Sequence, residues 1–348
     1  MKSNNLTCPI PFNENERITM AHGGGGKAMQ KLIDSCIIET FDNQYLNEKN
    51  DSSVLPITNN KIAFTTDSFV IKPIFFPGGD IGSLAVIGTV NDLAVSGAEP
   101  RYISAAFIIE EGFLINDLFR IVKSMYETAR KVGVEIVTGD TKVVEKGHGD
   151  GIYINTTGIG EFNITDLPSS KKIQEGDKII INGDIARHGM AVMAAREGLE
   201  FESTIESDCE ELSTIIKKLL DEGIRIHCMR DLTRGGLVSG LVEVIQQTNL
   251  SCIIEENKIF VKDEVNAACE ILGLDPLYVA NEGKFVMIIH QDDENKALKI
   301  LHESNSGKHA VTIGQVAKTN PGNVLIKNFL GVTRYLEMIN GEQLPRIC

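Results

Sequence analysis

The chain has 348 residues, of which 42% are hydrophobic, and this is enough for two domains that fold without disulfide staples. Its 48 acidic and 34 basic residues give a formal net charge of -14. Phosphate backbones and anionic lipids would repel such a surface, which argues against a general nucleic-acid or membrane-surface binder. Plain solubility is the simplest explanation of the charge itself.

The cysteines and the apolar segments indicate a cellular compartment. Seven cysteines are spread along the chain with no CxxC pair and no histidine spacing suited to zinc. The first residues carry no apolar core of signal-peptide length, and no stretch reaches the roughly 18 apolar residues that span a bilayer. We therefore expect a cytoplasmic protein with reduced thiols and no membrane partner.

The first half of the chain is expected to alternate strands with amphipathic helices. β-branched and aromatic residues predict strands over 61–71, 102–109, 136–138 and 151–161. Apolar residues at helical spacing predict helices over 84–95 and 118–132. Gly133 is a natural stop for the second helix. Residues 163–176 are polar and contain Pro and Gly, so they are the expected linker.

The second half continues with a mixture of both element types. It is expected to contain a strand over 178–183, helices near 188, 212 and 236, and further alternation to about 335. Strands such as 152–156 alternate polar with apolar residues, which suits sheets covered on one face and favours an α+β fold over a doubly wound parallel sheet. The expected divisions are a leader over 1–40, domains over 41–165 and 166–338, and a tail over 339–348.

The tail differs from the rest of the chain. It opens with Asn-Gly, contains Pro345, and has too few apolar residues to form an element of its own, so we expect it to be mobile. It ends in Cys348. A thiol on a flexible arm can visit two places, as a covalent carrier requires.

The run from His22 to Lys27 (HGGGGK) is the least ordinary local motif. Its glycines, Gly23, Gly24, Gly25 and Gly26, allow backbone N–H groups to approach phosphate oxygens, and Lys27 adds a cation. Ala28 to Leu32 would begin the helix that follows. The Walker pattern fails, because Ala28 stands where Ser or Thr would hold magnesium. A phosphate loop and a flexible surface loop therefore both remain open.

Three aspartates lie at the ends of expected elements in the first domain: Asp67 in TTDSF, Asp92 in VNDLAVSG and Asp140 in TGDTK. Carboxylates from converging loops are the hard oxygen ligands that magnesium takes beside nucleotide phosphates. Taken singly, each is more simply a turn or cap residue. Their occurrence together with a glycine-rich loop favours nucleotide binding.

Charged residues in the second domain stand in apolar surroundings. Arg230, Asp231 and Arg234 fit an ion-pair lattice at a domain seam. Glu282 precedes the expected strand from Phe285, where it is either a base with a raised pKa or a turn residue. His188, like His22, is either a capping or solvated residue or a catalytic one. The internal cysteines are expected to be buried small hydrophobes in helices or strands.

Together these residues resemble the HypE family of hydrogenase maturation factors, which are carbamoyl dehydratases in the aminoimidazole ribonucleotide synthetase (PurM-type) superfamily. The likeness runs from about Ile18 to the last residue. Its most specific motifs are HGGGGKAM, FTTDSFV, GTVNDLAVSGAEP, TGDTKVV, DPLYVANEGKFV and the terminal PRIC. The family motif RDPTRGG here has Leu232 in place of proline, a departure expected to relax one turn.

The resemblance implies a two-domain α+β fold in which the N-terminal domain pairs with its copy, so that strands of both subunits close into a barrel, and the C-terminal domain is an α/β sandwich. It implies ATP and Mg²⁺ beside that dimer interface. The glycine run and Lys27 are the implied phosphate loop. The other implied nucleotide residues are Asp67, Asn91, Asp92, Gly139 and Asp140, and the implied metal ligands are Asp67, Asp92 and Asp140.

The resemblance also implies a reaction and its partners. A HypF-like carbamoyltransferase places a carbamoyl group on Cys348, ATP phosphorylates the carbamoyl oxygen, and loss of a nitrogen proton expels phosphate to leave an S-cyanide. Phosphate is a good leaving group where hydroxide is a poor one. Glu282 and Lys142 would assist the proton removal. The cyanide would pass to an iron centre on a HypC–HypD complex, destined for a [NiFe]-hydrogenase.

Two alternatives are weaker. Selenophosphate synthetase has a related fold but generally carries a reactive Cys or selenocysteine just before the glycine loop, where this chain has His22. A non-catalytic scaffold that docks other maturation factors through its acidic surface would release no phosphate.

Overall fold

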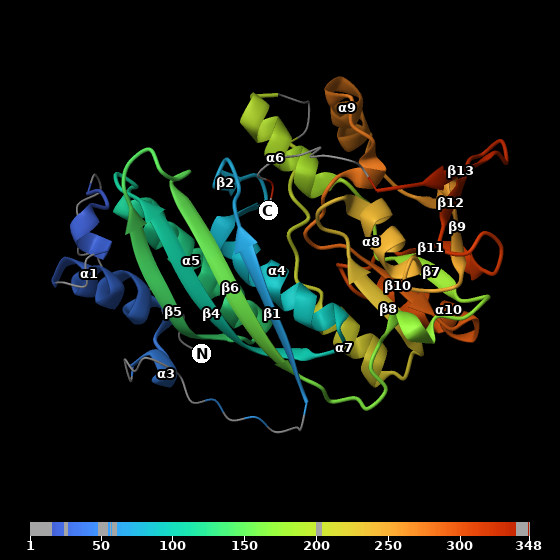
Figure 1. The fold of residues 1–348 in the computed structure, drawn as a ribbon, viewed down its shortest axis with the longest axis horizontal. Coiled ribbons are helices and arrows are strands. Elements are labelled where there is room, and N and C mark those ends of the chain that lie inside the picture. The colour runs from blue at the N-terminus through green and yellow to red at the C-terminus, as the bar shows by residue number, and fades with distance from the viewer. Residues whose placement is uncertain are drawn as a thin grey trace.

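The structure is a computed structural model, and it describes residues 16–23, 27–47, 55, 57, 61–199, 204–338 and 347. The fold has two halves, each built on one main β-sheet, and residues 162–177 join them. Figure 1 shows the two sheets side by side, with α4 and α7 lying between them. Among the helices in the described ranges, none is long and apolar enough to cross a membrane.

The N-terminal half is organised around a four-stranded sheet of order β1-β6-β4-β5. Its strands are β1 (Ile62–Phe69), β4 (Glu99–Glu110), β5 (Glu135–Val144) and β6 (Ile152–Glu161). β6 pairs antiparallel with β1 and β4, and β4 pairs parallel with β5. The helices α4 (Ile81–Val95) and α5 (Ile115–Val132) lie behind this sheet in Figure 1, which leaves its other face open. β6 alternates buried and half-buried residues accordingly.

The two helices are held by different features of their sequences. α5 is amphipathic, buries one stripe including Leu118 and Met125, and ends at Gly133, whose φ of 84° favours glycine. α4 is buried almost all round because the sheet covers one side and the C-terminal half covers the other. Asp80 caps it through hydrogen bonds from the backbone of Gly82 and Ser83, which starts the helix three residues before the apolar pattern predicts.

Short elements complete this half. They are η1 (Met20–Gly23), α1 (Lys27–Leu32), the π-helical η2 (Ile33–Ile38), α2 (Glu39–Phe41), α3 (Gln44–Asn47), β2 (Phe75–Phe76) and β3 (Gly79–Asp80). The segment from η1 to α3 packs on α5 and β5. β2 and β3 form a small hairpin just before α4.

The C-terminal half contains a seven-stranded sheet of order β13-β12-β9-β11-β7-β10-β8. Its strands are β7 (Lys178–Ile181), β8 (Ile226–Asp231), β9 (Ser251–Glu255), β10 (Phe285–Ile289), β11 (Val311–Ala317), β12 (Val324–Lys327) and β13 (Thr333–Leu336). Only β9 and β12 pair in parallel among these described strands. All five residues of β10 are buried, so this sheet is covered on both faces along β10, unlike the one-sided sheet that the alternating pattern favours.

Helices cover both faces of the second sheet. They are α6 (Arg187–Glu197), α7 (Ser213–Asp221), α8 (Gly236–Ile245), α9 (Asp263–Leu272) and α10 (Glu294–His302), with the 3-10 turns η3 (Ser170–Lys172), η4 (Glu256–Lys258), η5 (Pro276–Tyr278) and η6 (Gln291–Asp293). One core cluster includes α6, α8 and α9 residues, and a second joins α7 and α10. The expected helices near 188, 212 and 236 are therefore present.

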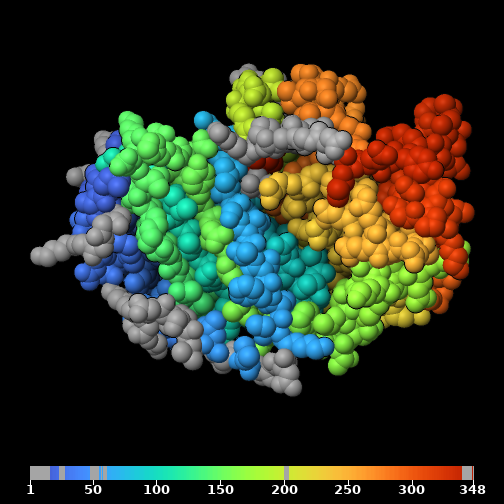
Figure 2. All heavy atoms as spheres, viewed as in Figure 1, coloured from blue at the N-terminus to red at the C-terminus, as the bar shows by residue number. Residues whose placement is uncertain are grey.

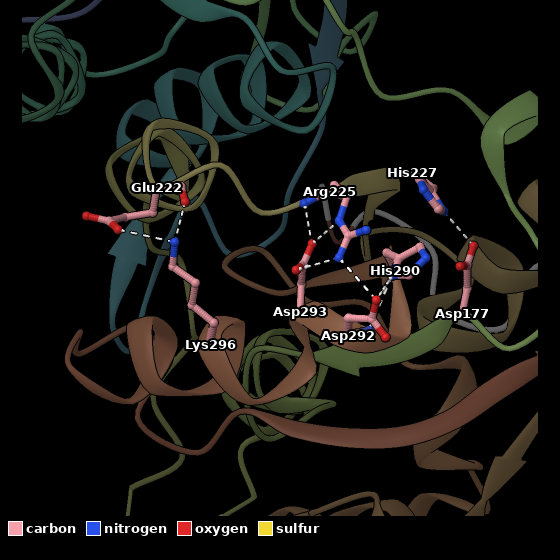
Figure 3. A network of polar contacts seen from close by, with 8 residues as sticks. All are labelled: Asp177, Glu222, Arg225, His227, His290, Asp292, Asp293 and Lys296. Carbon is pink, nitrogen blue, oxygen red and sulfur yellow. Dashed lines mark hydrogen bonds and ion pairs between the residues drawn. The ribbon is translucent and has the colours of Figure 1, made fainter.

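A polar network holds the start of β8 against the end of β10 (Figure 3). The guanidinium of Arg225 makes two hydrogen bonds to Asp293, with Nε 2.8 Å from Oδ2 and one terminal nitrogen 2.9 Å from Oδ1, and its backbone N–H donates to Oδ2 at 2.9 Å. His227 Nδ1 lies 2.6 Å from Asp177 Oδ2, at the entrance to β7. These contacts hold one end of β8 in place. The other end of the strand carries Asp231, which lies in the space between the two halves.

Candidate active site

A cleft of about 520 Å³ lies between the two halves. Its walls are the exposed edge strand β1, one side of α4, and the end of β8 with the following loop. Figure 2 shows the surface indented where β1, in blue, meets the yellow residues of the C-terminal half. Three of its lining side chains are the carboxylates Asp67, Asp92 and Asp231.

Asp67 and Asp92 form the acidic wall on the N-terminal side. The hydroxyl of Thr65 donates to Asp92 Oδ2 at 2.9 Å, and the backbone N–H of Ser68 donates to Asp67 Oδ1 at 2.7 Å. Burial raises the pKa of both carboxyls, and the charge of Asp67 raises the pKa of Asp92 further. A cation in the cleft would relieve this repulsion.

The opposite wall carries Asp231, Arg230 and Arg234. Burial, followed by the charge of Asp92, raises the pKa of Asp231 to about 7. Arg230 forms an ion pair with Glu243 of α8 rather than with Asp231. The expected lattice at the domain seam is thus only partly present, and the two arginines instead offer positive charge along the cleft.

Leu232 lies in the turn that follows β8, and its expected relaxing effect on that turn stays a prediction. Its side chain is fully buried, and its N–H donates to the carbonyl of Lys284 at 2.9 Å. Its own carbonyl accepts from the backbone and the side chain of Asn281, at 3.1 and 2.8 Å. A proline could not make the first bond. The leucine therefore ties the turn to residues 281–284, which include Glu282.

Glu282 is buried beside Asp208. Its side chain is 3% exposed, and its N–H donates to Asp208 Oδ1 at 3.2 Å. Burial, followed by the charge of Asp208, raises the pKa of Glu282 well above its ordinary value. Asp208 Oδ2 and Glu282 Oε1 have no hydrogen-bond partner within the described residues. Such a pair can hold or accept a proton for a bound group.

Asn91 connects this acidic region to α4. Its amide nitrogen donates to the carbonyls of Glu210 and Glu282, both at 3.1 Å, and its oxygen accepts from the N–H of Leu212 at 2.8 Å. The residue is 3% exposed. Nucleotide binding by Asn91 stays a prediction; in the structure its amide holds the two halves together.

Asp140 and Lys142 lie on the other side of the first sheet. Asp67 pairs with Thr156 of β6, which is buried. Asp140 pairs with Ala106 of β4, which in turn pairs with Asn155, the neighbour of Thr156 on β6. Since successive strand residues point to opposite faces, Asp140 points to the open face. Lys142 Nζ lies 3.1 Å from Asp140 Oδ2 there. A single chain therefore does not bring Asp140 to Asp67 and Asp92, or Lys142 to Glu282.

Gly139 has a structural reason to be glycine. A Cβ at this position would lie 2.0 Å from the carbonyl oxygen of Ala105 on β4. The closeness of β4 and β5 thus depends on it. A role in nucleotide binding is compatible with this geometry but is not needed to explain the residue.

Several expected site residues fall at the margins of the structure. Gly24, Gly25, Gly26 and Cys348 lie outside the described residues, whereas Gly23 ends η1 and Lys27 begins α1. His22 caps its own turn, because its Nδ1 accepts from the N–H of Thr19 at 3.0 Å.

One residue of the expected tail is described, and it is not loose. Ile347 is 2% exposed, and its carbonyl lies 2.8 Å from Nε2 of His188. His188 is therefore neither solvated nor a helix cap. Ser207 Oγ lies 2.8 Å from its other ring nitrogen.

The segment around Asp208 escaped prediction because it has no regular structure. Residues 204–212 precede α7 without a helix or strand, so no periodicity marks them. Cys209, expected in a helix or strand, lies in this segment and is half-buried, whereas Cys36, Cys228, Cys252 and Cys269 are buried as expected. The acidic run ESDCEE was the available signal, and by itself it indicates only a solvated segment.

No group of three or more His, Cys, Asp or Glu side chains in the described part of the chain is gathered closely enough to hold a metal ion. Asp67 and Asp92 are nevertheless two hard-oxygen donors in one cleft. Mg²⁺ is usually held by one or two carboxylates together with substrate phosphates, so this pair fits a nucleotide-borne ion.

Comparisons with known proteins identify the family and the fold. The profiles of the AIR synthase related protein family match residues 49–162 (N-terminal domain) and 174–327 (C-terminal domain). The carbamoyl dehydratase HypE of Azotobacter vinelandii is 44% identical over 96% of this chain and 98% of its own length. A solved structure of the hydrogenase maturation protein HypE in complex with ATP superposes with a TM-score of 0.91, at 44% identity, covering 94% of this chain and 99% of that one. A HypE–HypF complex gives a TM-score of 0.78 at 45% identity, covering 90% and 100%.

Proposed function

The chain belongs to the HypE family of carbamoyl dehydratases, with the PurM-like two-domain fold, and from this premise we propose that it uses ATP to dehydrate an S-carbamoyl group on Cys348 to an S-cyanide. The cyanide serves the iron centre of a [NiFe]-hydrogenase. One observation carries the proposal: Ile347, the residue before Cys348, is buried and bonded to His188. The charge of Asp208, which is bonded to the N–H of Glu282, acts on the pKa of this histidine.

The reaction needs a site for phosphoryl transfer from ATP and a base that removes a proton from nitrogen. The carbamoyl oxygen takes the γ-phosphoryl group of ATP, and the C–O bond then breaks as phosphate leaves, while the nitrogen gives up both protons and becomes the nitrile. Glu282 accepts one of these protons, and the other leaves with the phosphate. Its raised pKa makes the ionised form a stronger base than an ordinary carboxylate, and its burial keeps water from the intermediate.

The cleft provides the nucleotide site in this proposal. Asp67 and Asp92 would hold Mg²⁺ together with phosphate oxygens, and the ion would offset charge on the transferring phosphoryl group. Arg230 and Arg234 face the same space. η1 packs on β5, at the edge of the first sheet opposite β1, so the glycine run and Lys27 would reach phosphates in the cleft of a second copy.

A homodimer completes the site. The open face of the first sheet exposes Ile62 (45%), Phe64 (67%) and Ile108 (42%), side chains that a second sheet would cover. Pairing through these faces would close the shared barrel. It also explains why Asp140 and Lys142 lie on the open face: each would serve the cleft of the other copy.

The partners follow from the route of the carbon atom. A HypF-like carbamoyltransferase loads Cys348, consistent with the solved HypE–HypF complex, and a HypC–HypD complex accepts the cyanide. In this proposal the tail moves out of its docked position to meet either partner and docks again for the ATP-dependent step. The setting is the cytoplasm.

Intact-mass spectrometry tests the function. Protein carbamoylated by a HypF-type transferase should lose the mass of one water when Mg-ATP is added, with one phosphate released per chain, and the change should map to the last peptide. Cys348→Ala should abolish both signals. Retained phosphate release in Cys348→Ala would overturn the carrier role and favour another ATP-using enzyme of the superfamily, and absence of any release from the carbamoylated protein would favour a scaffold.

A further inference from the structure

His188 stands out as a buried histidine bonded on both ring nitrogens. It lies in the first turn of α6 and is fully buried. Its Nε2 is 2.8 Å from the carbonyl oxygen of Ile347, and its Nδ1 is 2.8 Å from the hydroxyl of Ser207. Phe76 packs against the ring edge to face, with centroids 5.5 Å apart. The ring thus connects the second-last residue of the chain to the interior.

The partners determine the protonation of the ring. A carbonyl oxygen only accepts, so Nε2 carries a hydrogen and donates it to Ile347. Burial lowers the pKa of His188 and keeps the ring neutral, so Nδ1 accepts from the hydroxyl of Ser207. The same hydroxyl accepts from the N–H of Cys209 at 3.1 Å. Every polar atom in this chain of bonds has a partner.

The receiving surface is rigid where the tail docks. The N–H of Ser207 donates to the carbonyl of Pro77 at 2.9 Å. Gly78 follows with a φ of 89°, and a Cβ there would lie 2.8 Å from the nitrogen of Ser207. The hairpin of β2 and β3 therefore presses directly on the segment that orients His188.

This surface borders the acidic pair. Asp208 follows Ser207, and its charge acts on the ring of His188. Asp208 Oδ2 and Glu282 Oε1 lie there without hydrogen-bond partners among the described residues. Ile347 as a whole is 2% exposed, so its side chain is packed inside the protein while its carbonyl is bonded to His188.

We propose that His188, oriented by Ser207, is a positioning residue that anchors the tail through the Ile347 carbonyl and so holds Cys348 beside the Asp208–Glu282 pair. The inference rests on the proposed function in that Cys348 is the carrier. It adds a residue that touches neither ATP nor the carbamoyl group. It acts only by setting where the terminal thiol lies.

The test compares two substitutions of His188. His188→Phe keeps the ring packing but removes both nitrogens, whereas His188→Gln keeps an N–H donor at a similar reach. His302→Phe is the matched control, because His302 Nε2 also bonds a carbonyl, that of Ala310, at 2.8 Å. For each protein, two rates are measured: alkylation of Cys348 by iodoacetamide, mapped by peptide mass spectrometry with and without Mg-ATP, and dehydration of the carbamoylated protein in a single turnover.

His188→Phe should speed alkylation of Cys348 about tenfold in both conditions, the equivalent of about 1.4 kcal/mol, and slow dehydration by a similar factor. His188→Gln should stay within about threefold of wild type in both rates, and His302→Phe should match wild type. If His188→Phe does not fold, Ser207→Ala replaces it, with the same directions expected at a smaller size.

Each other outcome has a definite meaning. Wild-type alkylation rates in both His188→Phe and Ser207→Ala would overturn the anchor. Faster alkylation with unchanged dehydration would overturn the positioning role. Failure of the wild type to dehydrate its carbamoyl group, with the alkylation pattern as expected, would refute the proposed function and leave the anchor standing.

Discussion

Asn91 is the residue whose replacement most directly tests how the two halves are held together. Its amide makes three hydrogen bonds to backbone groups of the C-terminal half: a part-buried one to the carbonyl of Glu210, a buried one to the carbonyl of Glu282, and a buried one from the N–H of Leu212. The substitution Asn91→Ala removes all three and leaves those groups buried without partners.

The size of the effect follows from these bonds. Each buried hydrogen bond contributes about 1 kcal/mol net, and an unpaired buried group costs about 1–3 kcal/mol. Alanine regains roughly 0.5 kcal/mol of helix propensity within α4. Asn91→Ala should therefore lower the free energy of unfolding by about 3 kcal/mol.

Urea unfolding followed by circular dichroism measures this loss. Asn266→Ala is the matched control, because Asn266 lies on the exposed side of α9 and its amide bonds only Glu270 of the same helix, at 2.9 Å, among the contacts described. It should change stability by no more than about 0.5 kcal/mol. A loss below about 1 kcal/mol in Asn91→Ala would refute the reasoning. Unchanged stability with a lost ATP-induced rise in Tm would instead make Asn91 a nucleotide ligand.

Three further predictions concern the acidic groups and one glycine. Glu282→Gln should slow single-turnover dehydration at least about 100-fold with little change in Tm, since glutamine resembles the protonated side chain; a rate near wild type excludes Glu282 as the base. Gly139→Ala should destabilise the fold by about 2 kcal/mol or more, because its Cβ meets the Ala105 carbonyl, whereas the control Gly149→Ala, with only ordinary contacts, should change unfolding little; equal urea midpoints would contradict this. The pKa of Asp231 is raised to about 7, so between about pH 4 and pH 7 the folded state holds a proton that the unfolded chain has released. The contribution of this group to the free energy of unfolding is therefore full below about pH 4 and is lost as the pH rises to about 7. Asp231→Asn should flatten the fall of Tm over that window, and parallel Tm curves of the two proteins would argue against the raised pKa.

The helices and strands with strong local patterns were predictable. The stripe on 118–132 and the stop at Gly133 give α5 to within a turn, since both are local properties of the sequence. α4 begins three residues early because a capping box precedes the apolar pattern. Strand β5 extends to Val144, well beyond the predicted 136–138, because pairing with β4 outweighs the turn-forming Gly and Asp of TGDTK.

The site was predictable as a set of residue types but not as an arrangement. Motifs indicated Asp67, Asp92, Asp140 and Glu282, yet a sequence does not tell which face of a strand a residue will occupy until the register is known. A one-residue difference in register separates Asp140 from the face of Asp67. Asp208 was missed because an irregular segment has no period, and its importance comes only from the packing of Glu282 against it.

α4 links these observations, because two consecutive residues of this helix have different tasks. Asp92 faces the cleft beside Asp67, while Asn91 donates to the carbonyl of Glu282 at 3.1 Å. The distance between the proposed nucleotide site and the proposed base is therefore fixed within one turn of a buried helix. Since a displacement of about 1 Å can cost a reaction about 100-fold, rigid coupling of the two halves should matter to the rate as well as the carboxylates themselves. In the proposed function the tail has to move, and docking of the Ile347 carbonyl at His188 would return the thiol to a site that α4 holds in place.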